Sequence, residues 1–66
     1  MTPRATNPKR LMRLKEAANY VSLSPGKLRA IIQRDEIRIV RYGEHAPWLI
    51  DIRDLDAWID QHKESL

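Results

Sequence analysis

The chain has 66 residues, enough for one small domain with a thin core, and its lack of cysteine excludes disulfides and thiolate metal sites. No apolar run approaches the roughly 18 residues of a membrane span, and no signal-peptide core is present, so we expect a cytoplasmic protein without membrane contact. The net charge of +3 is unevenly divided, because ten of the twelve Lys and Arg but only three of the nine Asp and Glu fall in residues 1–41. This division predicts a basic side of the molecule that suits a polyanion. The alternative is an accidental surface dipole.

Residues 1–10, MTPRATNPKR, contain two prolines and three bases without periodicity, which predicts a flexible basic arm. The next motif is LKEAANYV, residues 14–21, whose apolar residues recur at helical spacing. Its adjacent alanines, Ala17 and Ala18, give this helix a thin face that another helix can approach closely. The few residues that follow, up to Leu23, allow only a turn.

A second helix is predicted from residue 25 to about Arg34. Ser24 offers a hydroxyl N-cap, and Pro25 occupies the first helical position, where its missing N–H is not needed. The apolar residues of this helix form one stripe, comprising Leu28, Ile31 and Ile32. A helix, a three-residue turn and a second helix make up a helix-turn-helix arrangement.

The segments IRIVRY (37–42) and WLIDI (48–52) are predicted as two paired strands, with the loop GEHAP closing a β-hairpin between them. Asp51 is then expected to cap a last helix over residues 52–62. The expected buried stripe of that helix comprises Leu55, Trp58 and Ile59. We also expect Trp48 and Trp58 to anchor the core, because a small domain needs large apolar side chains.

The order of these motifs resembles the excisionase-type, MerR-like winged helix-turn-helix domains. The matching residues are Lys15-Glu16-Ala17-Ala18, Ser24, Glu36-Ile37, Val40-Arg41, Gly43, Trp48, Ile50 and Leu55-Asp56-Ala57-Trp58. The resemblance covers about residues 11–60. It implies an α+β fold, a small winged helix-turn-helix domain over residues 11–62 with a two-stranded β-hairpin wing and a C-terminal helix, followed by a tail at 63–66.

Three positions depart from the family pattern. Arg13 stands where the family usually has a capping Thr, so the hydroxyl cap of the first helix is lost and its start should fray. Asp35 replaces a Gly after the second helix, and Asp tolerates a left-handed backbone better than most residues. Glu44 lies in the wing loop where the family often has a base, and an acid there would repel phosphate.

The exposed face of the second helix is predicted to enter the major groove of DNA. Gly26 and Ala30 leave this face low, while Arg29 could pair with guanine and Gln33 with adenine. Lys27 and Arg34 are better placed for phosphates, which fix register but not sequence. The candidate DNA-binding residues of this helix are Ser24, Gly26, Lys27, Arg29, Ala30, Gln33 and Arg34. The alternative is a short solvated helix in a domain that binds something else.

Further candidates lie outside this helix. Those in the strand and wing are Arg38, Arg41, Tyr42 and His45, and weaker ones in the arm are Arg4, Lys9 and Arg10. A hairpin that only covers the core is an equal alternative for any single wing residue.

Catalytic and metal sites are not expected. His45 and His62 have no partner at ligand spacing, and the serines have no accompanying base and orienting acid. The stretch SPGK lacks the length of a phosphate-binding loop, and helix capping explains it. We therefore expect neither an enzyme nor a bound metal or cofactor.

The resemblance implies an excisionase, or recombination directionality factor, that binds and bends attachment-site DNA to promote integrase-mediated excision. It also implies that the protein acts in the cytoplasm of a bacterial cell, associated with the nucleoid. The implied partners are double-stranded DNA, an integrase and neighbouring copies of the protein on DNA. A small prophage-type transcriptional regulator and an adaptor that binds a protein through the acidic last helix remain alternatives. We expect a monomer in free solution, because the sequence contains no heptad for a coiled coil.

Overall fold

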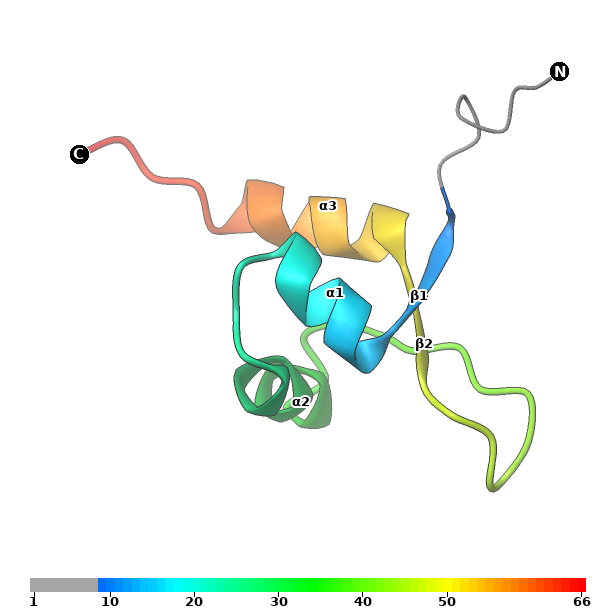
Figure 1. The fold of residues 1–66 in the computed structure, drawn as a ribbon. Helices are drawn as coiled ribbons and strands as arrows, with labels where there is room; N and C mark the ends of the chain where they lie inside the picture. The colour runs from blue at the N-terminus through cyan, green and yellow to red at the C-terminus, as the bar shows by residue number, and fades with distance from the viewer. Residues whose placement is uncertain (1–8) are drawn as a thin grey trace, which may run out of the picture.

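The computed structural model describes residues 9–66. Its elements, in chain order, are β1 (Leu11–Arg13), α1 (Leu14–Tyr20), α2 (Pro25–Gln33), β2 (Leu49–Asp51) and α3 (Ile52–Gln61) (Figure 1). Three helices and a two-stranded antiparallel sheet confirm the predicted α+β class of a small winged helix-turn-helix domain. None of the helices in the described part of the chain is long and apolar enough to cross a membrane.

The helix-turn-helix follows from local chemistry. The Ser24 hydroxyl accepts a hydrogen bond from the Lys27 amide at 3.2 Å, and Pro25 is the first residue of α2, as predicted. In the turn before it, Ser22 adopts a left-handed backbone with a φ of 62°, and the Leu23 amide donates to the Ala18 carbonyl at 2.9 Å. These contacts end α1 and redirect the chain within four residues.

The predicted strand over residues 37–42 is wrong. Of that segment, only Val40 forms a bridge, exchanging two backbone hydrogen bonds of 2.7 and 2.9 Å with Leu49. The alternating apolar residues have another cause: Ile37 is buried and Ile39 half-buried, and both pack against the core instead of extending a ladder. The residues between the bridge partners, 41–48, form a projecting loop that we call the wing loop (Figure 1).

The partner of β2 is β1, a strand that the sequence did not predict. The two strands are antiparallel, and their register pairs Leu11 with Asp51, Met12 with Ile50 and Arg13 with Leu49. The sheet therefore joins the start of the domain to the segment before α3. It does not join the two arms of a hairpin.

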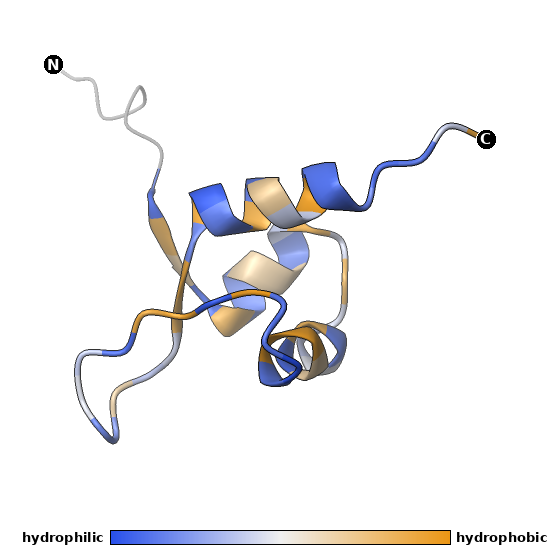
Figure 2. Ribbon diagram, turned by 180° about the vertical axis from the view of Figure 1, so that it is seen from behind, coloured by the Kyte–Doolittle hydropathy of each residue, from blue (hydrophilic) through white to orange (hydrophobic). Residues whose placement is uncertain are grey.

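The core lies where the three helices and the sheet meet. Figure 2 shows hydrophobic segments on the sides of the helices that face one another. The buried apolar residues are Met12, Ala17, Ala18, Leu28, Ile31, Ile32, Ile37, Ile50 and Leu55. Trp48 and Trp58 are half-buried and pack against this cluster, and Ile59 is also half-buried, so Leu55 alone of the stripe expected on α3 is fully buried.

The first described residues are attached to this fold. The Ile52 amide donates to the Arg10 carbonyl at 2.7 Å, and the Lys9 ammonium lies 2.9 Å from a Glu16 carboxylate oxygen. Arg13, at the N-cap of α1, forms no side-chain cap, as its identity predicts, and it lies at the end of β1. Residues 1–8 of the expected arm, including Arg4, lie outside the described residues.

Candidate nucleic-acid interface

The outer face of α2 is open and low. Gly26, Ala30 and Gln33 are exposed, on the opposite side of the helix from the buried Leu28 and Ile32. A Cβ atom built on Gly26 would meet nothing within 4 Å, so the fold does not require a glycine there. The small residues at the centre of this face are therefore not needed for packing inside the protein. They leave room for a ligand to approach the helix backbone.

The charged side chains fall into two groups. Five cations of the described residues form ion pairs: Lys9 with Glu16 (2.9 Å), Arg10 with Asp51 (3.0 Å), Arg34 with Glu36 (3.1 Å), Arg53 with Asp51 (3.6 Å) and Lys63 with Asp60 (3.2 Å). Within residues 9–66, the exposed cations without an ion pair are Arg13, Lys15, Lys27, Arg29, Arg38 and Arg41. This second group can bind an external anion without first giving up an internal carboxylate partner.

Five of these six cations line two grooves beside α2. The first, which we call the helix–wing groove, has a volume of about 520 Å³ and is lined by Arg13, Leu14, Lys15, Pro25, Arg29, Ala46, Pro47 and Trp48. The second, the linker groove, has a volume of about 390 Å³ and is lined by Ile32, Gln33, Asp35, Ile37, Arg38, Ile39, Arg41 and Trp48. Trp48 borders both grooves, and Lys27 lies in the first turn of α2.

Arg29 and Trp48 contact each other across the helix–wing groove. The guanidinium carbon of Arg29 lies 5.1 Å from the centroid of the Trp48 ring, within the range of a cation–π interaction. This contact joins the middle of α2 to the end of the wing loop. It also places the guanidinium at the flank of α2, beside the low centre of the exposed face.

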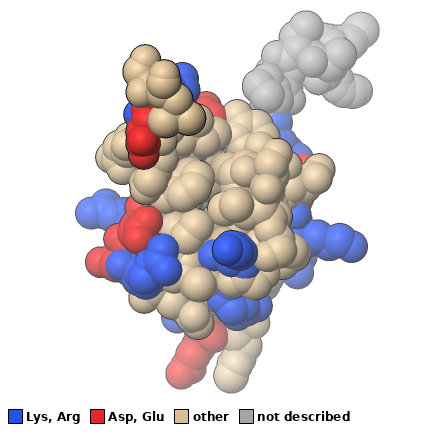
Figure 3. All heavy atoms as spheres, turned by 90° about the vertical axis from the view of Figure 1, so that its left-hand side faces the viewer, with Lys and Arg blue, Asp and Glu red and all other residues tan. Residues whose placement is uncertain are grey.

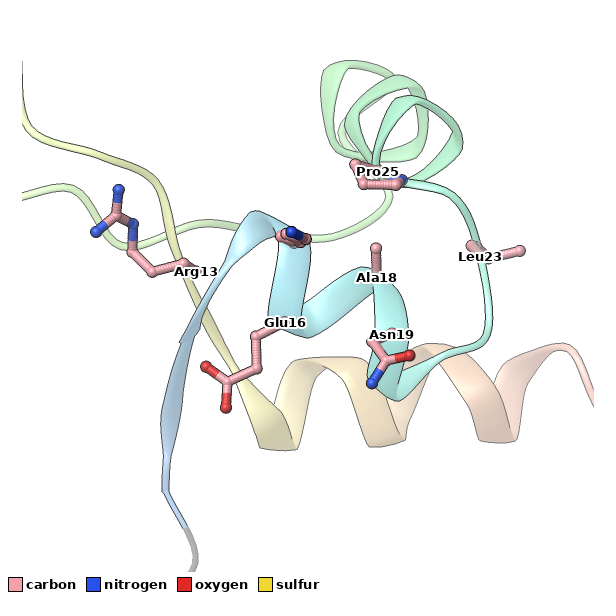
Figure 4. A pocket seen from close by; sticks show the side chains of 7 residues that line it. Arg13, Glu16, Ala18, Asn19, Leu23 and Pro25 are labelled. Atoms are coloured by element: carbon pink, nitrogen blue, oxygen red, sulfur yellow. The ribbon is translucent and has the colours of Figure 1, made fainter.

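A third groove, of about 550 Å³, lies along α1 and is lined by Arg13, Lys15, Glu16, Ala18, Asn19, Leu23 and Pro25. In Figure 4 the Ala18 methyl points toward Pro25 at the start of α2, whereas Glu16 and Asn19 point away from α2. The Glu16 carboxylate makes this groove less favourable for an anion than the helix–wing groove, whose lining contains no acid.

Three sequence-predicted cations have their charge engaged within the protein. Lys9 and Arg10 pair with Glu16 and Asp51, and Arg34 donates to Glu36. The indole N–H of Trp58 also donates to Glu36, at 3.3 Å. The hydrogen bonds from Arg34 and then Trp58 hold the pKa of Glu36 below its ordinary value. A DNA phosphate would have to compete with Glu36 for Arg34.

The other residues predicted to bind DNA are exposed, but they lie at separate places on the surface and do not form one common site. Arg38 and Arg41 are exposed at the linker groove, and His45 and Tyr42 are exposed on the wing loop, with Tyr42 79% accessible. The oxygen of the Ser24 hydroxyl accepts the capping hydrogen bond from the Lys27 amide.

Sequence reasoning missed two members of this surface, Arg13 and Lys15. Both lie where β1 passes into α1, and both line the helix–wing groove with Arg29. The signal that could have found them was the excess of bases in residues 1–41, of which these two had been assigned no contact with DNA. Their proximity to Arg29 depends on the tertiary fold.

Figure 3 shows how the charges are distributed on the side of the molecule that lies at the left in Figure 1. Lys and Arg side chains lie over the lower half of this face, where α2 lies in Figure 1, and along its right-hand side. Asp and Glu side chains lie mainly toward the left-hand edge and at the lowest point. The two signs are thus partly separated, and they mix where ion pairs form.

Comparison with known proteins agrees with this architecture. A family model described as "Helix-turn-helix domain" matches residues 11–63, which is most of the chain and includes α1, α2, the wing loop and α3. Searches of curated proteins and of solved structures returned no match. The protein therefore belongs to the helix-turn-helix domain family, and its fold is that of a small DNA-binding domain.

Proposed function

We propose that the protein binds double-stranded DNA sequence-specifically, with α2 as the recognition helix, and that it is a binding protein and not an enzyme. The observation that supports this most is the distribution of unpaired cations. All of those within residues 9–66 lie at the junction of β1 and α1, on α2, in the segment after α2 or at the start of the wing loop, whereas the acids of α3 lie elsewhere. Unpaired cations beside a low helix face suit a phosphate backbone that flanks a major groove.

Within this function, Gln33 is the residue we assign to base recognition. It is exposed on α2 next to the low surface of Gly26 and Ala30, and a Gln amide can form two hydrogen bonds with adenine. A good pair of this kind contributes about 1–3 kcal/mol of discrimination. Lys27, in the first turn of α2, is assigned to a phosphate, which fixes the register of the helix in the groove.

The more specific role that we propose is that of an excisionase. It is supported by the resemblance of residues 11–60 to excisionase-type, MerR-like domains and by the helix-turn-helix family match over 11–63. In this role the protein binds adjacent sites in bacterial attachment DNA, bends them and assists an integrase in the cytoplasm. Exposed acids on α3, among them Asp54 and Asp56, could meet the basic side of a neighbouring copy.

The first experiment measures binding to DNA. A duplex selected from a random library and a random duplex of equal length are titrated with the protein at several salt concentrations. We expect log Kobs to fall with log[salt] with a slope steeper than about −3, and tighter binding to the selected duplex. A flat salt response would contradict DNA binding and favour an adaptor that binds protein through α3.

A second experiment separates excisionase from transcriptional regulator. The selected site is placed at different positions along a fragment for a gel assay of bending, and duplexes with one and two sites are compared. We expect a bend and tighter binding per site on the two-site duplex. Unbent DNA with equal affinity per site would favour the regulator.

A further inference from the structure

The helix–wing groove brings together cations from three different elements, two of them close in sequence and one well separated from them. Arg13 comes from the end of β1, Lys15 from the first turn of α1 and Arg29 from the middle of α2. All three are exposed and belong to no ion pair in the part of the chain that the structure describes. The remaining lining is apolar, consisting of Leu14, Pro25, Ala46, Pro47 and Trp48.

This lining matches one chemical class of ligand. A phosphodiester carries one negative charge between two sugars that have apolar surfaces, so it needs cations beside non-polar walls. The helix–wing groove supplies both and contains no Asp or Glu that would repel the phosphate. Its neighbour along α1 has a similar volume but includes Glu16.

We propose that the helix–wing groove binds a phosphodiester of the DNA backbone, and that Trp48 holds Arg29 toward this phosphate and away from the bases. This proposal rests on the proposed DNA binding and changes the role that the sequence suggested for Arg29. The 5.1 Å contact with the Trp48 ring keeps the guanidinium at the wing side of α2. Arg29 is then a backbone contact, and Gln33 remains the base-reading residue of the helix.

A phosphate-binding and a base-reading role of Arg29 predict different effects of its substitution on DNA binding. A backbone contact supports binding to all sequences alike and contributes close to one unit to the salt slope, whereas a base contact determines preference at one or two base pairs. The test therefore uses a fluorescein-labelled random duplex of about 20 base pairs for the salt slope, together with selection from a random library for sequence preference.

We expect Arg29→Ala, Arg13→Ala and Lys15→Ala each to weaken binding to the random duplex and to reduce the magnitude of the salt slope by about 0.9. The sequences selected by Arg29→Ala should be those selected by the wild type. Gln33→Ala should instead keep the slope and lose preference at one or two base pairs. Lys63→Ala is the matched control, because it removes one exposed positive charge from the chain beyond α3 and should leave the slope unchanged.

The contribution of Trp48 is measured by a double-mutant cycle with Trp48→Leu, which removes the aromatic face. If Trp48 positions Arg29, Arg29→Ala should reduce affinity less in the Trp48→Leu protein than in the wild type. Trp48→Phe, which keeps a ring, replaces Trp48→Leu in the cycle if circular dichroism shows that the leucine variant unfolds. Additive effects of the two substitutions would overturn the positioning role.

Two further results would overturn the phosphodiester site. One is an Arg29→Ala protein with an unchanged salt slope and an altered base preference. The other is displacement of the duplex by millimolar inorganic phosphate at constant ionic strength, which would indicate a site for free phosphate. If the wild type binds no duplex in a salt-dependent way, the proposed function itself fails, and this outcome differs from all those above.

Discussion

The side chain of Arg10 donates a hydrogen bond of 3.0 Å to Asp51, joining two residues that lie 41 positions apart in the chain. The other carboxylate oxygen of Asp51 accepts the Arg53 amide at 2.9 Å and so caps α3. Asp51 is 9% exposed, and the Ile52 amide next to it bonds the Arg10 carbonyl. One carboxylate thus starts a helix and holds the beginning of the domain against it.

Substitution of Asp51 should therefore remove both the N-cap of α3 and the ion pair with Arg10. Asp51→Ala should lower the free energy of unfolding by about 1–3 kcal/mol, because an N-cap contributes about 0.5–2 kcal/mol and the charged hydrogen bond adds to it. Asp51→Asn, which can still cap, should be less destabilising. Urea unfolding followed by tryptophan fluorescence measures both values. Equal stability of Asp51→Ala and the wild type would contradict the role assigned to this residue.

Glu36 should make stability depend on acid pH. Because hydrogen bonds from Arg34 and Trp58 lower its pKa in the folded protein, the carboxylate stabilises the fold above its ordinary pKa of 4.5. That contribution is lost as the pH falls below 4.5 through the lowered pKa. We expect the wild type to be more stable than Glu36→Gln at pH 7, and the difference to shrink as urea unfolding is repeated toward pH 3. A difference independent of pH would show that the carboxylate charge is not involved.

Tyr20 should titrate above its ordinary pKa of 10.0. Its hydroxyl donates a 2.6 Å hydrogen bond to Asp56, and this bond raises the pKa because the ionised phenolate would lose it and be repelled by the carboxylate. Tyr42→Phe isolates Tyr20 for titration by ultraviolet absorbance. Adding Asp56→Asn should move the midpoint of Tyr20 to lower pH. The stabilisation belongs to the protonated form, so it is complete below pH 10 and lost as the pH rises beyond it.

Substitutions of Asp35 test whether the left-handed backbone after α2 is strained. Its φ of 65° is left-handed, a conformation that is unfavourable by about 1–2 kcal/mol for residues with a Cβ atom and open to glycine. Glycine also loses more chain entropy on folding, so Asp35→Gly should raise the free energy of unfolding by no more than about 1 kcal/mol. Asp35→Asn should remain close to the wild type, and Asp35→Val should be destabilising. Thermal unfolding measures the series, and a Val variant as stable as Gly would refute the strain.

Substitutions of Gly26 should affect the stability of the fold and the binding of DNA in different ways. Because a Cβ there meets no neighbour, Gly26→Ala should stabilise α2 by about 0.5–1 kcal/mol through helix propensity. A larger side chain should fold as well but raise the low surface, so Gly26→Gln should weaken binding to a selected duplex. Lys63→Gln, outside α2, provides the matched control for DNA binding. Undiminished binding by Gly26→Gln would argue against close approach of DNA at this face.

The sequence alone determined the helices and their ends. Ser24 and Pro25 start α2, Asp51 starts α3, and Asp35 accepts the left-handed turn, because capping, backbone preference and helical periodicity act over a few neighbouring residues. The same local signals placed Gly26, Ala30 and Gln33 on one exposed face.

The sequence also predicted the strand that contains Leu49–Asp51, but tertiary structure alone decided which strand pairs with it and which charges form ion pairs. The alternation of Ile37 and Ile39 is the same for a strand as for a segment packed on a core, and a three-residue strand such as β1 has too little pattern to indicate its partner. Likewise, the sequence counts cations but does not show which of them meet an acid. Arg34 becomes paired, and Arg13 has no ion pair within residues 9–66, because ion pairs depend on distances between side chains that only the folded chain sets.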